Sequence, residues 1–154
     1  MSKVARAARV ASRQRPEIIT GNKTISAAET GELFLFNYNA AATITVTLPP
    51  VREGAYFRFQ FMAQMSDNNA QINIVKNAAD AAGTIKGTIL CLIYAGSSVD
   101  TSIATNKDAG SGTQVELIDD IHVGSYVECH CDGTNWQFSG VVVASARGNA
   151  VFDA

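Results

Sequence analysis

From Glu17 onward, apolar and polar residues alternate along the chain, which predicts short β-strands. In the segment 43–48, the apolar positions are Ile44, Val46 and Leu48, and threonines stand between them. A period of two places the apolar set on one face of a strand and the polar set on the other. Two prolines follow directly, and they end the strand because proline has no backbone N–H for the ladder. We therefore expect a half-buried strand here.

The strongest core signal lies in the segment 55–63. Phe57, Phe59 and Phe61 share one face of the expected strand, and polar or amphipathic residues share the other. Each buried aromatic ring removes about 150–250 Å² from water. This strand should therefore anchor the core. The segment 71–75 continues the alternation, with two isoleucines facing inward.

Two further runs, 33–38 and 88–94, are apolar at successive positions. A strand formed by either run is therefore apolar on both faces. Such a strand is covered on two sides. It lies either at the centre of the fold or between a sheet and a neighbouring subunit, and both placements remain open from the pattern.

Three more strands are expected late in the chain, at 113–118, 126–131 and 136–144. The turn Asp132–Asn135 should join the last two as a hairpin. About eight to ten short strands, with no long amphipathic helix, predict an all-β single domain: an antiparallel β-sandwich, jelly-roll-like, or a β-barrel. The segment 95–112, rich in Gly, Ser, Thr and Asp, is typical of a long loop.

Charge divides the chain into a basic N-terminal arm (1–16) and a β-domain (17–154). The domain holds 7 of the 12 basic residues and all 14 acidic ones, a net charge of -7. The arm holds no acidic residue and carries +5. Its five cationic residues, which we expect to bind a partner protein, are Lys3, Arg6, Arg9, Arg13 and Arg15.

The same charge distribution bears on nucleic acids and membranes. Five cationic residues would bind nucleic acid weakly and without sequence preference, and the acidic domain would repel a duplex, so no specific nucleic acid is expected. No apolar run approaches the roughly 20 residues of a membrane-spanning helix. The chain is therefore expected to be soluble.

Cysteine and histidine are the first candidates for metal chemistry. Cys129 and Cys131 flank His130 in an expected strand, whereas the common zinc sites use a wider cysteine spacing. Alternation places both thiols on the face of Val127 and the imidazole on the opposite face. With Cys91 the count is odd, which argues against a disulfide framework and fits a reducing compartment. We expect buried thiols, no metal and no cofactor.

Catalytic patterns find no support. The sequence lacks a G-x-S-x-G elbow, an H-E-x-x-H helix and a P-loop. Glu116, Asp119 and Asp120 form an acidic group near a strand end, which is more typical of solvated turn residues than of a glycosidase pair. Trp136 and Phe138 alternate into the expected core, which leaves no aromatic platform for sugars or bases. We expect no catalytic residue and no enzyme activity.

Two segments resemble elements of bacteriophage virion proteins. Ile44–Pro50 followed by Gly54 and Tyr56–Phe59 is similar to a "T-I-T-L-P, then G-x-x-F-x-F" element of that class. Tyr126–Trp136 is similar to its closing hairpin, in which D-G-T-N-W links two strands, and Ile25–Gly31 matches its opening. These elements occur in capsid decoration (cement) proteins and in head-fibre and tail-fibre domains.

The resemblance implies a non-enzymatic structural protein of the virion. Because the chain is one compact domain with one cationic arm, we expect a decoration protein on the capsid surface, made in the host cytoplasm. The implied partners are the major capsid protein and further copies of the chain in a homotrimer. The alternative is a receptor-binding or adhesion domain of a head or tail fibre, with 95–112 as its contact loop. The arm and this loop have no counterpart in the matched elements.

Overall fold

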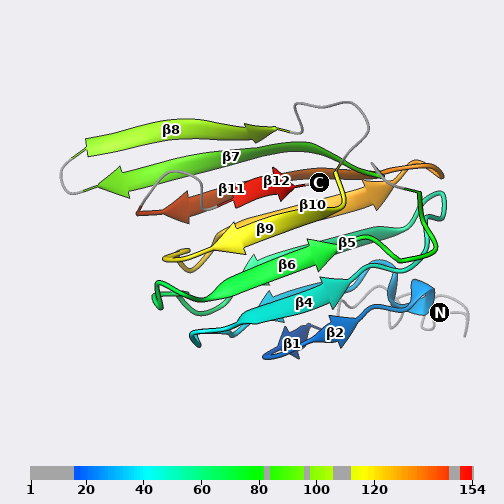
Figure 1. The fold of residues 1–154 in the computed structure, drawn as a ribbon, viewed down its shortest axis with the longest axis horizontal. Coiled ribbons are helices and arrows are strands. Elements are labelled where there is room, and N and C mark those ends of the chain that lie inside the picture. Colours follow the sequence, from blue (N-terminus) through cyan, green and yellow to red (C-terminus); the bar gives the residue numbers. More distant parts are fainter. Residues whose placement is uncertain (1–15, 82–83, 96–97, 106–111, 146–149, 154) are drawn as a thin grey trace, which may run out of the picture.

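The structure, a computed structural model, describes residues 16–81, 84–95, 98–105, 112–145 and 150–153. These ranges contain twelve strands and a short 3-10 helix, η1 (Ala27–Glu29), and the strands form two sheets (Figure 1). The seven-stranded sheet runs, in spatial order, β1 (Glu17–Ile19), β3 (Leu33–Phe36), β5 (Tyr56–Phe61), β10 (Tyr126–Cys131), β11 (Trp136–Ala144), β7 (Ile85–Ala95) and β8 (Ser98–Thr105). The five-stranded sheet runs β12 (Ala150–Asp153), β9 (Gln114–Ile118), β6 (Gln71–Val75), β4 (Thr43–Thr47) and β2 (Lys23–Thr24).

The two sheets face each other across one hydrophobic core, and Figure 1 shows β4, β6 and β9 lying over strands of the other sheet. Aromatic rings fill the seven-stranded side. The Phe59 ring stacks on those of Phe34 and Phe36, with centroids 5.4 and 5.7 Å apart. The rings of Trp136 and Phe57 are in contact, with their centroids 5.6 Å apart. The prediction that the aromatic strand anchors the core is confirmed.

Alternation predicted the other inward faces correctly as well. Ile44, Val46 and Leu48 are buried, as are the two isoleucines of β6. The hairpin between β10 and β11 forms as expected, and Gly133 in its turn has a φ of 95°. A positive φ is the conformation for which glycine has no steric penalty. Among the residues described, no helix combines the length and hydrophobicity needed to cross a membrane.

The all-β sandwich is confirmed, but the antiparallel jelly roll and the barrel are wrong. Among the described strands, five pairings are parallel and five are antiparallel. Strands β1 to β6 alternate between the two sheets, so β1, β3 and β5 run parallel in one and β2, β4 and β6 in the other. A parallel pair needs a crossover connection. Here a strand of the opposite sheet serves as the crossover, so no helix is required.

The segment expected as a long loop contains a strand. β8 pairs antiparallel with β7 from Thr88 to Ala95, so these two strands form a hairpin at one edge of the seven-stranded sheet. Val99, Thr101, Ile103 and Thr105 supply a β-branched residue at every second position. β-branched residues favour strands. Asp100, Ser102 and Ala104 stand between them, so the segment does not alternate between large apolar and polar residues.

Strands β3 and β7, which are apolar on both faces, each lie second from an edge of the seven-stranded sheet. The central placement is therefore wrong. One face of each strand meets the core, and the other lies on the outside of the sandwich. On β7 the outward side chains Leu90 and Tyr94 are 36% and 56% exposed. The other placement predicted for these two-faced strands, between the sheet and a neighbouring subunit, stays a prediction.

Candidate interaction surface

The partner-binding residues predicted from the sequence lie outside the residues that the structure describes. They are Lys3, Arg6, Arg9, Arg13 and Arg15. The described chain starts at Pro16 and leads directly into β1, an edge strand of the seven-stranded sheet. The role of the arm therefore stays a prediction.

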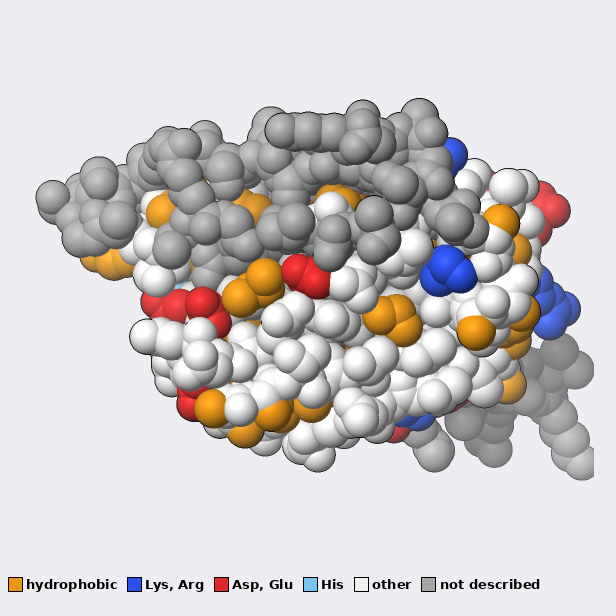
Figure 2. Space-filling view, viewed as in Figure 1, with side chains coloured by type: hydrophobic (Ala, Val, Ile, Leu, Met, Phe, Trp, Pro, Cys, Tyr) orange, Lys and Arg blue, Asp and Glu red, His pale blue; other side chains and the backbone are white. Residues whose placement is uncertain are grey.

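The outer face of the five-stranded sheet is polar and carries little charge. Strand register aligns Thr45, Asn73 and Glu116 in a row across β4, β6 and β9. Gln71 Nε2 donates a hydrogen bond of 2.7 Å to Asn73 Oδ1 within this face. Figure 2, viewed from this side, shows few charged side chains over the part of this face that is not drawn in grey, with scattered hydrophobic ones. This face has the composition of a hydrated protein surface.

The outer face of the seven-stranded sheet is different because apolar and aromatic side chains cross it. One row of aligned residues runs from β1 to β7 and consists of Ile18, Leu35, Gln60, Tyr126, Val141 and Leu90. Val143 and Leu92 form a second pair beside it. Ile18 is 52% exposed, and the other members are exposed or half-buried. We call these eight residues the apolar outer face.

A hydrogen-bonded aromatic and charged cluster lies beside the apolar outer face, on β5 and β10. The Arg58 guanidinium lies 4.3 Å from the ring centre of Tyr126 and 3.7 Å from Glu128 Oε2. Tyr56 donates a hydrogen bond of 2.9 Å to the same carboxylate oxygen. Tyrosine and arginine are the residue types enriched at the centres of protein interfaces. The cluster therefore has interface chemistry.

The charges of Arg58 and Glu128 compensate each other within the cluster. Burial, the hydrogen bond to Glu128 and the negative charge of that carboxylate raise the pKa of Tyr56. The phenol therefore stays a neutral donor near neutral pH, and Arg58 offsets the charge of Glu128. Alternation predicts the outward residues of β5 but not the cluster, because the register between β5 and β10 cannot be inferred from either segment alone.

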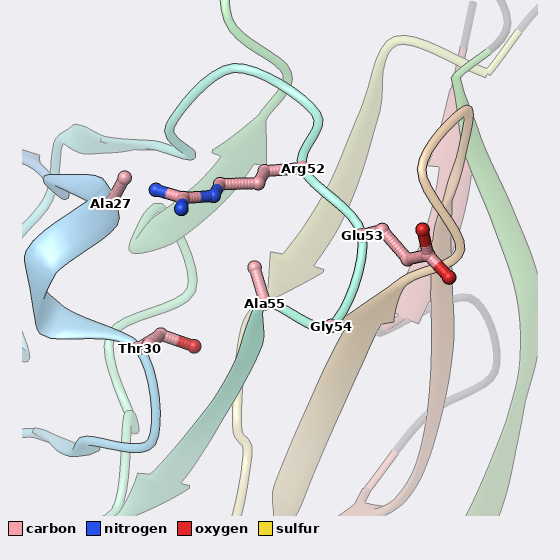
Figure 3. Close-up of a pocket in the computed structure, with 6 residues that line it drawn as sticks. All are labelled: Ala27, Thr30, Arg52, Glu53, Gly54 and Ala55. Carbon is pink, nitrogen blue, oxygen red and sulfur yellow. The ribbon is translucent and has the colours of Figure 1, made fainter.

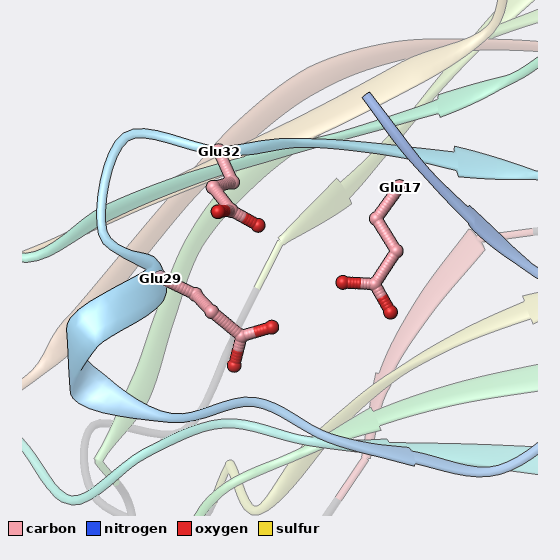
Figure 4. Close-up of side chains that lie close together, drawn as sticks. All are labelled: Glu17, Glu29 and Glu32. Carbon is pink, nitrogen blue, oxygen red and sulfur yellow. The ribbon is translucent and has the colours of Figure 1, made fainter. Parts of the chain in front are cut away.

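Three carboxylates converge near the start of the described chain, from Glu17, Glu29 and Glu32 (Figure 4). The ammonium of Lys23 already lies among them, 2.9 Å from Glu17 Oε1 and 2.6 Å from Glu29 Oε1. Burial acts to lower the pKa of Lys23, but the hydrogen bonds to Glu29 and Glu17 outweigh it and raise that pKa. The protonated amine of Lys23 therefore occupies the place that a metal ion would take among these carboxylates. The group links β1, β2 and η1.

A hollow of about 250 Å³ lies between η1 and the turn before β5 (Figure 3). Arg52 extends into it toward Ala27, whereas the carboxylate of Glu53 points to the opposite side. The hydroxyl of Thr30, on the wall, accepts a hydrogen bond of 3.0 Å from the backbone N–H of Tyr56. Arg52 and Glu53 are the two ionisable residues among the six that line the hollow, and their side chains point to opposite sides.

The cysteines behave as predicted. Cys91, Cys129 and Cys131 are buried, and His130 is exposed on the opposite face of β10. Burial raises the pKa of Cys129 well above its usual value, which keeps this thiol protonated. Cys131 Sγ accepts a hydrogen bond of 3.1 Å from the backbone N–H of Arg52.

The acidic group near the end of β9 has structural partners. Asp119 and Asp120 both have positive φ, 44° and 37°, in the bend that follows the strand. Hydrogen bonds from Ser145 and Gln64 lower the pKa of Asp120. Glu116 lies on the outer face of β9 and accepts a hydrogen bond from Gln114. These contacts fit the expected turn.

Comparison of the chain with protein-family models, curated protein sequences and solved structures found no match. The functional proposal therefore depends on the chain's own residues and on the resemblance of its strand and hairpin elements.

Proposed function

We propose that this chain is a structural virion protein, a decoration (cement) protein that binds and stabilises the assembled shell of a bacteriophage. The observation that carries the proposal is the apolar outer face of the seven-stranded sheet, with Tyr126 at its centre and Arg58 beside it. A hydrophobic face with aromatic and arginine anchors is suited to contact with other proteins. On this proposal the protein is not an enzyme, needs no cofactor and forms a homotrimer on the capsid surface.

The basic arm would provide the contact with the shell, because the apolar outer face serves the contact between copies of the chain. Arginine forks bind carboxylates in a bidentate manner, so five cationic side chains suit an acidic surface of the major capsid protein. In an oligomer the arms act together, which raises the overall affinity through effective concentration. A protein that binds the assembled lattice in preference to free subunits stabilises the lattice by mass action.

Binding to isolated shells tests the proposal. The full chain should co-sediment with shells, and a chain lacking residues 1–16 should fold yet show sharply reduced occupancy. A second variant, with glutamine at the five basic arm positions, keeps the chain length and removes the charge. Its occupancy should fall as well. Undiminished occupancy of both variants would contradict the role of the arm, and no binding of the full chain would contradict shell decoration.

The alternative is an adhesion domain of a fibre. In its favour, the uncharged polar face with Thr45, Asn73 and Gln71 offers hydrogen-bonding groups suited to sugar hydroxyls. Against it, the described side chains in those rows include no aromatic ring that could stack on a sugar. A glycan array separates the two functions, because decoration predicts no bound glycan.

A further inference from the structure

The two outer faces of this sandwich differ although each covers the same core. On β4, β6 and β9 the outward residues aligned with Thr45 are polar, whereas those aligned with Tyr126 on the other sheet are mainly apolar. A strand with one solvated face alternates apolar and polar residues. β4 follows this rule, and β3 and β7 break it on the same outer face. The described residues place no further layer over that face.

We propose that a second copy of this chain covers the apolar outer face, so that the face is the interface between copies. The interface would be centred on Tyr126 and Val141, which are partners in the β10–β11 register. Leu35 on one side and Leu90 on the other would extend it. This assembly does not depend on shell binding and can form in solution.

Charge does not oppose an identical partner on this face. Residues 17–154 carry a net charge of -7, so two copies repel each other wherever acidic surface meets acidic surface. The aligned outward residues of β5, β10, β11 and β7 include the cations Arg58 and Lys86 and the anion Glu128. Arg58 and Glu128 also pair with each other. Two copies can therefore approach through this face with little repulsion.

The size of the face also fits a second copy. The seven strands have 3 to 11 residues each, and at about 3.3 Å per residue and about 4.8 Å between strands they cover a flat projection of roughly 700 Å². A stable interface buries about 800 Å² of accessible surface on each partner, and side-chain relief raises accessible area above the flat value. Sheets pack face to face at a spacing of about 10 Å with interdigitating side chains. The face is thus large enough for a stable contact.

The basic arm fits this face less well than a second copy does. An arm of charge +5 is attracted to acidic surface. The aligned charges here are two cations and one anion, so they offer the arm no net attraction. The arm is therefore free to serve a different, acidic partner.

Sedimentation equilibrium of the full chain and its variants tests the interface. The double variant Leu90→Glu with Tyr94→Glu changes two exposed side chains, and we expect it to raise the dissociation constant at least about 30-fold. The double variant Thr43→Glu with Thr47→Glu is the matched control, because it adds the same two charges to the outer face of the other sheet. This control should leave association unchanged. A wild-type chain that is monomeric at about 100 μM, or equal weakening by the control, would overturn the proposal.

Thiol crosslinking provides a second measurement, which does not depend on how strongly the glutamate variants weaken association. Ser139 is exposed and aligned with Glu128 on the same outer face, and the native cysteines are buried. Ser139→Cys should give covalently linked copies with a short thiol-specific crosslinker, whereas Thr43→Cys on the other sheet should not. Linkage through Thr43→Cys alone would overturn the assignment of this face. A linked dimer without trimer would support the face and contradict the proposed homotrimer.

Discussion

At the scale of single residues, close approach of the backbone constrains the sandwich as much as the large aromatic rings do. Gly87 lies in β7 opposite Phe138, and a Cβ at this position would lie 2.0 Å from the Phe138 carbonyl oxygen. Its φ of 137° is also one that residues with a side chain rarely adopt. The parallel β7–β11 pairing therefore requires glycine here. In the sequence, Gly87 directly precedes the apolar run 88–94, and nothing there indicates this close approach.

Replacing this glycine should be costly. Gly87→Ala adds a methyl group that clashes with the backbone of β11 and strains φ, so we expect a loss of roughly 2–4 kcal/mol in the free energy of unfolding. Gly21→Ala is the control, because a Cβ there meets nothing within 4 Å and φ is not positive. Chemical denaturation measures both. Equal stability of the two variants would show that β7 and β11 do not approach as closely as described.

The carboxylate of Asp132 organises the β10–β11 turn and should make it sensitive to acid. It accepts hydrogen bonds from Gln137 Nε2 and from the backbone N–H groups of Asn135 and Thr134, at 2.9, 2.7 and 2.8 Å. These bonds lower the pKa of Asp132 below its usual 3.8, the bond from Gln137 contributing most. A lowered carboxyl pKa stabilises the fold above the unfolded-state pKa, and this contribution is lost as the pH falls toward the folded-state value.

The stability difference between wild type and Asp132→Asn should therefore be constant from about pH 7 to pH 5 and change below pH 4. An NMR titration of the Asp132 carboxyl carbon is the direct measurement, with an expected midpoint below 3.8. A midpoint at or above 3.8 would contradict the described turn.

At the scale of the elements, local alternation identified most strands and their inward faces but could not predict which strands pair. β4, β5 and β6 were recognised because each alternates cleanly. Their parallel pairing across two sheets depends on contacts distant in sequence, which no single segment encodes. β8 was missed because its segment does not alternate between large apolar and polar residues. The runs in β3 and β7 that are apolar on both faces indicated that an outer face would be apolar. Which face this is could be seen only from the order of the strands in the sheet.

The first strands are short, so side-chain ion pairs should contribute visibly to their stability. Lys23 bridges Glu17 of β1 and Glu29 of η1, and its ammonium lies 5.7 Å from the ring centre of Phe34. Lys23→Ala should lower the free energy of unfolding by about 1 kcal/mol or less, the range of partly exposed pairs. It should also accelerate amide hydrogen exchange in β1 more than elsewhere.

The variant Lys23→Met separates charge from packing, because methionine keeps an apolar side chain beside Phe34 and removes the ammonium. We expect it to retain part of the stability and to expose β1 to exchange nearly as much as Lys23→Ala does. Unchanged exchange in β1 with both variants would show that the ion pairs do not hold this strand.

At the scale of the whole molecule, the charge division and the two unlike outer faces suggest a division of tasks. On the proposed account, the apolar outer face serves copies of the chain, and the basic arm serves an acidic partner. On this account the protein reinforces a shell, because its contacts between capsomers must break before the shell can expand. Particles decorated with the protein should therefore rupture at a higher temperature than bare particles. Equal rupture temperatures would contradict reinforcement.

The most direct test of shell decoration is the number of copies of this chain in purified virus particles, measured by quantitative mass spectrometry against the major capsid protein. A decoration protein covers the lattice, so the account predicts a copy number in fixed proportion to the capsid subunits and of the same order. A few copies per particle, as for a fibre, or no copies at all would contradict it.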